Sequence, residues 1–134
     1  MTQLHHQMPI KCVTSDGEGA SYFSARTYDL SGDQERMLSE QIPALNFRLR
    51  QSGASYASGF HVAGDPTLLI MLKGRLKIEL RNGEACEFSA GEMFIAEDYL
   101  AAGVVFDELV HGHRAEVLGG DEISVLHLKL EKRL

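Results

Sequence analysis

Short apolar runs separated by glycine dominate the chain from residue 45 onward. In residues 45–50 the apolar side chains fall on every second position, and residues 75–81 repeat this alternation with Leu76, Ile78 and Leu80 on one parity. Strict alternation predicts strands with one buried face and one solvated face. Residues 67–72 are apolar on both parities, which predicts a strand that is covered on both sides.

Turn signals lie between these runs. Asn82-Gly83 tolerates positive φ at both central positions of a turn and therefore predicts a tight hairpin into residues 84–88. Gly119-Gly120-Asp121 separates residues 113–118 from residues 123–130 and predicts a second hairpin. Many short strands at this spacing favour an all-β sandwich or barrel.

Two segments depart from this pattern. Residues 33–41 resemble a helix, with Ser31 and Gln34 placed like a capping box, and a surface loop is the equal alternative. Residues 100–110 have no regular period and predict a long loop, which is where binding function tends to lie.

Composition narrows the class of protein. With 134 residues, 44% of them apolar, the chain fits one domain, 1–134. A formal charge of -6 argues against nucleic acid and against an anionic membrane surface as partners. The run from 68 to 72 is too short to span a membrane, and residues 1–9 lack a signal pattern, so we expect a cytoplasmic protein. Cys12 and Cys86 form no CxxC motif and predict free thiols.

Five short motifs occur in a characteristic order. They are Ser15-Asp16-Gly17-Glu18, Phe60-His61, Leu72-Lys73-Gly74, the stretch 91–98, and Gly112-His113-Arg114. This order resembles the cupin superfamily, and most of all its small single-domain bacterial members. The resemblance implies an all-β jelly-roll barrel, a double-stranded β-helix with its core at about residues 45–130 and N-terminal strands within 10–30 packing on or extending the sheet. It also implies a pocket at the open mouth of the barrel and frequent dimerisation.

The resemblance is incomplete at the metal motif. Metal-binding cupins supply a His-x-His pair and a Glu from the first motif and one His from the second. In this chain Ala63 stands at the second His position and Thr67 at the Glu position. Only His61 and His113 remain of the usual four ligands.

The histidines are the strongest candidates for chemistry. On an extended strand His111 and His113 would share one face, and His61 could join them across the barrel. Three imidazoles could hold one divalent transition metal, namely zinc, iron, nickel or manganese, with Glu97 or Glu108 as a fourth ligand or a general base. The alternative is that these histidines are hydrogen-bonded structural residues.

Three functions stay open at this stage, and the sequence does not decide whether the chain is an enzyme. The first is binding of a small molecule in a pocket lined by Phe60, His61, Met71, His111 and His113. The second is a metal-dependent enzyme, a dioxygenase or isomerase acting on a small polar organic compound. The third is a non-catalytic dimeric module. We expect a homodimer in any case, because pairing removes an exposed sheet edge.

Overall fold

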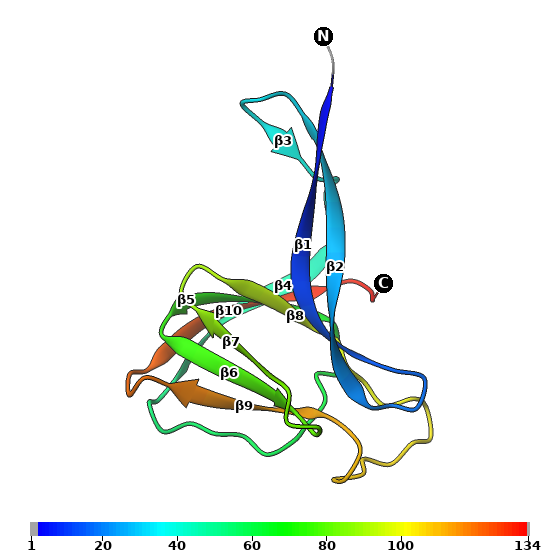
Figure 1. The fold of residues 1–134 in the computed structure, drawn as a ribbon, viewed down its shortest axis with the longest axis vertical. Coiled ribbons are helices and arrows are strands. Elements are labelled where there is room, and N and C mark those ends of the chain that lie inside the picture. The colour runs from blue at the N-terminus through cyan, green and yellow to red at the C-terminus, as the bar shows by residue number, and fades with distance from the viewer. Residues whose placement is uncertain (1–2, 134) are drawn as a thin grey trace.

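The computed structural model describes residues 3–133 as ten strands in two sheets, with no helix among them and so no helix that could cross a membrane (Figure 1). The order is β3-β2-β1-β8-β5-β10-β4 in the seven-stranded sheet A and β7-β6-β9 in the three-stranded sheet B. The strands are β1 (Leu4–Ser15), β2 (Ser21–Gly32), β3 (Met37–Leu38), β4 (Ala44–Ser52), β5 (Thr67–Lys73), β6 (Arg75–Leu80), β7 (Ala85–Ser89), β8 (Met93–Ala96), β9 (His113–Leu118) and β10 (Ile123–Leu130).

One long antiparallel ribbon crosses from one sheet to the other and gives the fold its jelly-roll character. Strands β5 and β8 pair in sheet A, and their continuations β6 and β7 pair in sheet B. The crossing occurs at Gly74, whose φ is 81°. A Cβ atom added there would lie 2.5 Å from the carbonyl oxygen of Glu122. Only glycine fits such a corner. The prediction of an all-β jelly-roll fold is confirmed.

Strands β9 and β10 do not form the hairpin that their glycine turn predicts. Strand β9 pairs with β6 in sheet B, whereas β10 lies between β5 and β4 in sheet A. Val117 of β9 and Val125 of β10 belong to the same buried cluster, so the two strands pack face to face across the core. Because each strand buries its apolar face against the other, the two strands lie in different sheets and do not pair through their backbones. The hairpin prediction was therefore wrong, and the glycine turn links the two sheets.

The space between the sheets is filled by apolar side chains. The rings of Phe88 and Phe94 stack with centroids 4.3 Å apart, and Met71 packs in the same cluster. The remaining buried members of the cluster are Val13, Leu76, Ile78, Leu80, Ala96, Val117, Ile123 and Val125. The centre of the barrel is therefore filled with apolar side chains, and a polar site can lie only at its ends or on its outer faces.

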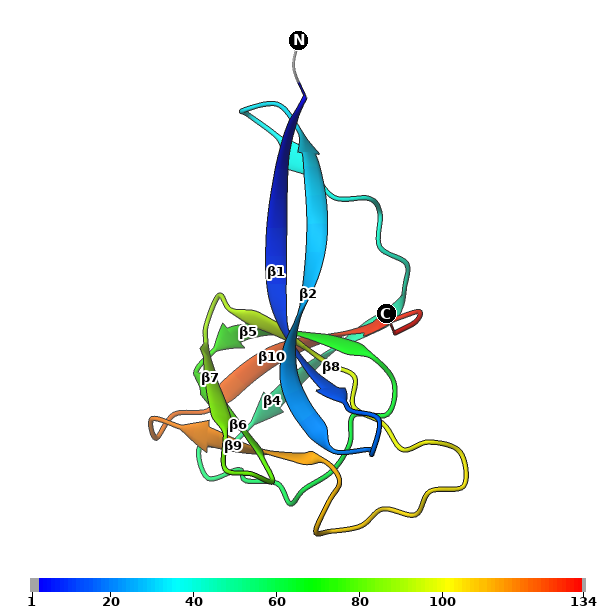
Figure 2. The same cartoon turned by 45° about the vertical axis from the view of Figure 1, so that its right-hand side comes forward.

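A long hairpin projects from the barrel. Strands β1 and β2 pair from Leu4 opposite Gly32 onward, but only Cys12 and Val13 of β1 also pair with β8. The outer part of this hairpin, residues 4–9 and 27–32, forms an arm that stands away from the two sheets (Figures 1 and 2). The N-terminal strands thus extend sheet A and also reach beyond it.

Of the two alternatives for residues 33–41, a helix or a surface loop, the helix does not form. The carboxylate of Asp33 accepts hydrogen bonds from the backbone N–H groups of Glu35 and Arg36 at 2.9 and 3.0 Å, which closes a tight turn. Strand β3 follows this turn and pairs with the end of β2. A local side-chain bond to the backbone therefore replaces the capping box, as short acidic residues often do.

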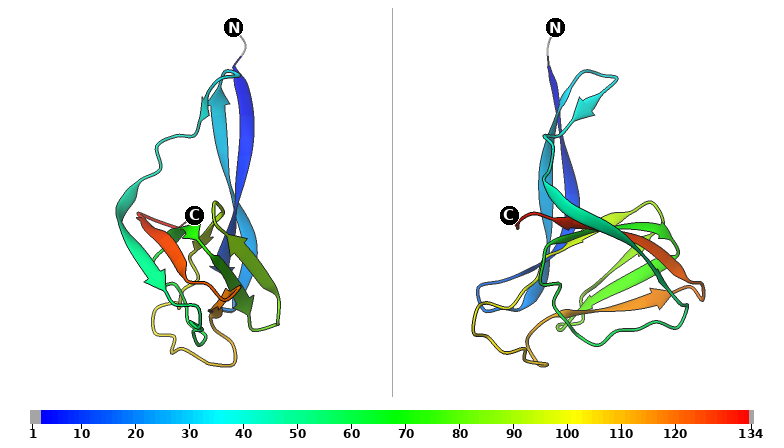
Figure 3. Two further views of the ribbon diagram at one scale, coloured as in Figure 1. Left: turned by 90° about the vertical axis from the view of Figure 1, so that its left-hand side faces the viewer. Right: turned by 180° about the vertical axis from the view of Figure 1, so that it is seen from behind.

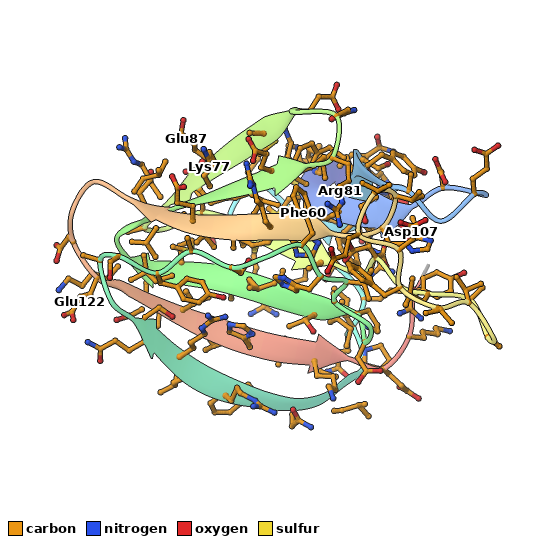
Figure 4. All side chains as sticks on the ribbon, turned by 90° about the horizontal axis from the view of Figure 1, so that it is seen from below. Phe60, Lys77, Arg81, Glu87, Asp107 and Glu122 are labelled. Carbon is orange, nitrogen blue, oxygen red and sulfur yellow. The ribbon has the colours of Figure 1, made fainter. Side chains whose placement is uncertain are left out.

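The outer faces of the two sheets differ in polarity. The outer face of sheet B carries ion pairs between neighbouring strands, Arg75 with Glu87 and Lys77 with Glu116, both at 3.7 Å. Lys77 and Glu87 lie on this outer side (Figure 4). Cross-strand ion pairs of this kind are typical of a face that stays in water.

The outer face of sheet A is apolar instead. Its side chains come from three adjacent strands that the register places side by side, and we call them the outer apolar face: Leu45, Phe47, Leu49, Leu68, Ile70, Leu126 and Leu128. The edge strand β4, beside β10 (Figure 3), leaves Leu45, Phe47 and Leu49 60%, 63% and 68% exposed. The prediction that residues 45–50 bury one face was wrong for the isolated chain, because no described segment packs on that face.

The inner face of β10 yields a pH prediction. His127 is half-buried there, and burial lowers the pKa of its imidazole, as do the charges of Arg50 and Arg48. Below about pH 6.5 the unfolded protein therefore binds more protons at His127 than the folded protein does. The free energy of unfolding is not reduced by this residue above that pH, and it declines as the pH falls toward the pKa of His127 in the folded protein. Urea unfolding between about pH 7.5 and about pH 5.5 should show a shallower decline for His127→Gln than for the wild type. Equal slopes would contradict the assignment.

Candidate functional site

His61 and His113 meet at one end of the barrel. Each donates its backbone N–H to the carbonyl of the other, at 2.8 and 2.9 Å, which attaches the segment 56–61 to the edge of β9. Their rings lie with centroids 4.7 Å apart and planes inclined by 55°. The structure therefore brings these two predicted residues together through a bridge between the segment 56–61 and the start of β9, and not across the barrel.

Asp98 holds this pair in place. Its carboxylate is fully buried and accepts hydrogen bonds from Nδ1 of His113 at 2.7 Å, the hydroxyl of Ser21 at 2.6 Å and the backbone N–H of Ala63 at 2.9 Å. Burial by itself raises the pKa of Asp98, but the bonds to His113, Ser21 and Ala63 and the charge of His113 outweigh it, so the pKa lies below its ordinary value. We call His61, His113, Asp98 and Ser21 the mouth site.

The hydrogen bonds also set which ring nitrogens are available. Nδ1 of His113 donates to the Asp98 carboxylate, and Nδ1 of the exposed His61 donates to the carbonyl of Gly59 at 3.0 Å. In the neutral rings Nε2 is then the acceptor. The mouth site therefore offers two acceptor nitrogens on adjacent rings, one on an exposed side chain and one on a buried one.

Asp98 was not among the predicted site residues. In residues 93–98 it shares the parity of Phe94 and Ala96, which both point into the core. A carboxylate on the buried parity of an apolar strand needs a partner, and this signal could have marked it. Sequence reasoning missed the residue because an adjacent Glu97-Asp98 pair at a strand end is more often solvated.

Gly112 makes the contact between the two histidines sterically possible. It has a φ of 89°, and a Cβ there would lie 2.7 Å from the carbonyl oxygen of His61. Gly83 has nearly the same φ, 88°, but nothing lies within 4 Å of its Cβ position. We expect Gly112→Ala to lower the free energy of unfolding by about 2 kcal/mol more than Gly83→Ala in urea titrations, because only the first adds a clash to the shared backbone strain. Equal losses would show that the approach of His61 imposes no constraint.

His111 lies apart from the mouth site. Strand β9 begins at His113, and the left-handed backbone at Gly112 breaks the alternation that would have put His111 on the same face. The buried His111 ring accepts the backbone N–H of Asp107 at Nδ1, at 2.9 Å, and its Nε2 faces the backbone of Gly19. Its observed hydrogen bond closes the end of the loop 99–110, and Gly19 of the turn between β1 and β2 lies beside its ring.

The side chains do not fit a resident metal ion. Within residues 3–133 no three His, Cys, Asp or Glu side chains are grouped so that they could share one ion. His61 and His113 could each offer Nε2 to an ion, but Ala63 and Thr67 supply no further ligand. Structural zinc sites use four protein ligands and catalytic ones three. Among the described residues the mouth site thus offers two imidazoles, one fewer than the three protein ligands of a catalytic zinc site.

The two predicted carboxylates lie elsewhere. Glu97 points to the opposite side of the chain from Asp98, where it accepts a bond from the thiol of Cys12 at 2.9 Å and pairs with Arg26 at 3.3 Å. Both charged groups are buried, and burial followed by the bond to Glu97 raises the pKa of the Cys12 thiol. Glu108 is exposed in the loop 99–110. Neither is placed to act with His61 and His113.

The other predicted pocket residues have contacts of their own, although Phe60 precedes His61 in the chain and its ring lies 5.1 Å from the guanidinium carbon of Arg114. The ring of Phe60 lies 3.6 Å from the guanidinium carbon of Arg81, which donates to the carbonyl of His111, and this contact lies beside the loop that carries Asp107 (Figure 4). Met71 is packed in the core. Of the five predicted lining residues, His61 and His113 thus share a site, whereas Phe60, Met71 and His111 each have other neighbours.

A groove of about 810 Å³ opens on another part of the surface. One wall is the arm, and the other is the segment that leads from β3 to β4. Tyr28 and Asp29 lie along the first wall, and Ser39, Ile42 and Pro43 along the second. Leu130, the last residue of β10, also lines the groove and packs in one apolar cluster with Leu128, so the groove adjoins the outer apolar face.

The comparisons with known proteins concern the fold. The sequence matches no family model and no curated protein. Solved structures similar to the chain include the cupin domain of Cnp3 from Schizosaccharomyces pombe, with 11% identity, 92% of this chain and 88% of that chain covered, and a TM-score of 0.48. Protein NMB1881 from Neisseria meningitidis shows 17% identity over 69% and 84% of the two chains, with a TM-score of 0.46. The SPY1581 protein from Streptococcus pyogenes shows 15% identity, with 76% of this chain and 80% of that chain covered and a TM-score of 0.45. The fold assignment rests on the strand pairings above, and no function is carried over from these likenesses.

Proposed function

We propose that this chain is a homodimeric jelly-roll module that associates through the outer apolar face. The observation that supports this most strongly is the exposure of Leu45, Phe47 and Leu49 at 60–68% on one edge strand. Contiguous apolar surface on a soluble protein marks an interaction site more often than not. The other outer face, that of sheet B, carries ion pairs and supports no such role.

A second copy of the chain is the partner that best matches this surface. None of the seven side chains of the outer apolar face carries a charge, so the matching surface must also be apolar. The chain itself provides one, and a two-fold axis places the same patch on both sides of the interface. Association would also protect the free edge of β4, which is unpaired among the described strands.

The arm and the groove extend the same surface. Leu130 and Pro43 line the groove, and each lies two residues from a member of the outer apolar face, Leu128 and Leu45. A second copy seated on the outer apolar face would therefore also reach the groove.

Sedimentation equilibrium tests this proposal. One chain has a mass of 14.8 kDa, and we expect a species of twice that mass at about 50 μM protein. The dimer should persist in high salt, because apolar contacts do not weaken when charges are screened. A single species of monomer mass up to that concentration would overturn the proposal.

The mouth site supports a second candidate function, the binding of a small polar molecule. The observation that favours it is the pair of Nε2 acceptors on His61 and His113, which suits a ligand with hydroxyl or other hydrogen-bond donors. A thermal-shift screen should then find a compound that raises the melting temperature of the wild type but not of His61→Ala. Equal shifts in both proteins, or no shift in either, would remove this candidate.

A further inference from the structure

The inner side of strand β4 carries two arginines that lie on one face. Arg50 is opposite Val125 of β10, and Arg48 is opposite His127. Val125 is buried in the core between the sheets, so both arginines stand on the inner side of the edge strand and not on the outer apolar face. Two residues apart on a strand, their Cα atoms are separated by about 6.6 Å. Both side chains are exposed, so one small ligand from solvent could reach the two guanidinium groups.

Neither arginine has an acidic partner. Among residues 3–133 the ion pairs leave out both Arg48 and Arg50. Arg50 instead lies 4.7 Å over the ring of Tyr56 and donates from Nε to the hydroxyl of Ser52 at 3.0 Å. The carboxylate of Asp65 is taken by Lys129 at 3.0 Å. With nineteen acidic against thirteen basic residues, the chain does not lack carboxylates that could have filled this role.

His127 lies beside the two arginines and is affected by their positive charge. Its Nε2 is buried and makes no hydrogen bond with any described residue. Burial lowers the pKa of the imidazole, and the charges of Arg50 and Arg48 lower it further, with no acidic group acting in the opposite direction. The inner edge of β4 and β10 is thus locally positive in a chain whose formal charge is -6.

We propose that Arg48 and Arg50 form a binding site for a small oxyanion, a carboxylate or a phosphate, at the inner edge of sheet A. The planar fork of a guanidinium group matches the paired oxygens of these anions and binds them more tightly than a point charge does. The ring of Tyr56 provides a wall for one of the two groups. The site is separate from the mouth site and lies on the opposite face of β4 from the proposed dimer surface, so it stands or falls independently of both.

Titration calorimetry with inorganic phosphate and with succinate tests the site. The wild type should bind at least one of the two probes, and the affinity should fall about tenfold or more in Arg48→Gln/Arg50→Gln. The matched control is Lys11→Gln/Arg36→Gln, which removes the same charge from exposed side chains elsewhere and should bind as the wild type does. Binding of phosphate alone or of succinate alone identifies the class of anion and supports the site.

A second measurement uses the unmodified protein, in case the double variant does not fold. Bound anion would offset the arginine charges, so the pKa of His127 in a proton NMR titration should rise when the saturating probe is present. A merely structural role for the two arginines would leave that pKa unchanged. No heat from either probe, an equal loss of affinity in the control variant, or an unchanged His127 titration with bound probe would each overturn the proposal.

Discussion

Asp98→Ala should lower the free energy of unfolding by about 3–5 kcal/mol, the range for removing one partner of a buried, hydrogen-bonded charge pair. The substitution removes the acceptor of three hydrogen bonds at once, those from His113, Ser21 and the backbone of Ala63. These donors come from β9, β2 and the segment after His61, so the loss also loosens the joint between three elements. Urea unfolding followed by circular dichroism, at one fixed protein concentration, measures the effect.

Asp121→Ala is the matched control for this substitution. Asp121 is also an aspartate, but its side chain is 69% exposed and its ion pair with Lys73 is long, at 3.9 Å. We expect a change within about 0.5 kcal/mol for it. A loss below about 1 kcal/mol for Asp98→Ala would mean that the buried carboxylate does not hold the mouth site together.

Phe47→Asp should convert the proposed dimer into a monomer. Burying a large apolar side chain contributes about 1.5–3 kcal/mol, and a two-fold interface loses this contribution twice while gaining two unpaired charges. The dissociation constant should rise by at least about a hundredfold. Sedimentation equilibrium across a dilution series gives this value directly.

Asn46→Asp controls for the added charge on the same strand. Asn46 is exposed like Phe47, but it lies opposite Lys129, and its side chain is on the inner face of β4. The control should therefore leave the monomer–dimer equilibrium within about threefold of the wild type. If both variants weaken association equally, the outer apolar face is not the contact.

Local patterns along the chain determined much of the fold. Alternation over residues 75–81 predicted β6 with Leu76, Ile78 and Leu80 buried, and Asn82-Gly83 predicted its turn into β7. Such features depend on the backbone preferences and periodicity of adjacent residues, which the sequence contains in full. The resemblance to cupins likewise selected His61 and His113, which do lie together.

Contacts between distant residues decided the rest. The same alternation that buries one face of β6 leaves Phe47 of β4 exposed, because nothing in the described chain packs on the outer face of that edge strand. Neighbouring Glu97 and Asp98 face opposite sides and bind Arg26 and His113, far away in sequence. Period and turn chemistry are set by neighbours along the chain, whereas coverage of a face and the partner of a buried charge are set by strands that meet only in the folded molecule. The sequence by itself therefore determined where strands and turns occur, and only the tertiary structure decided which of their faces are buried, exposed or joined in a site.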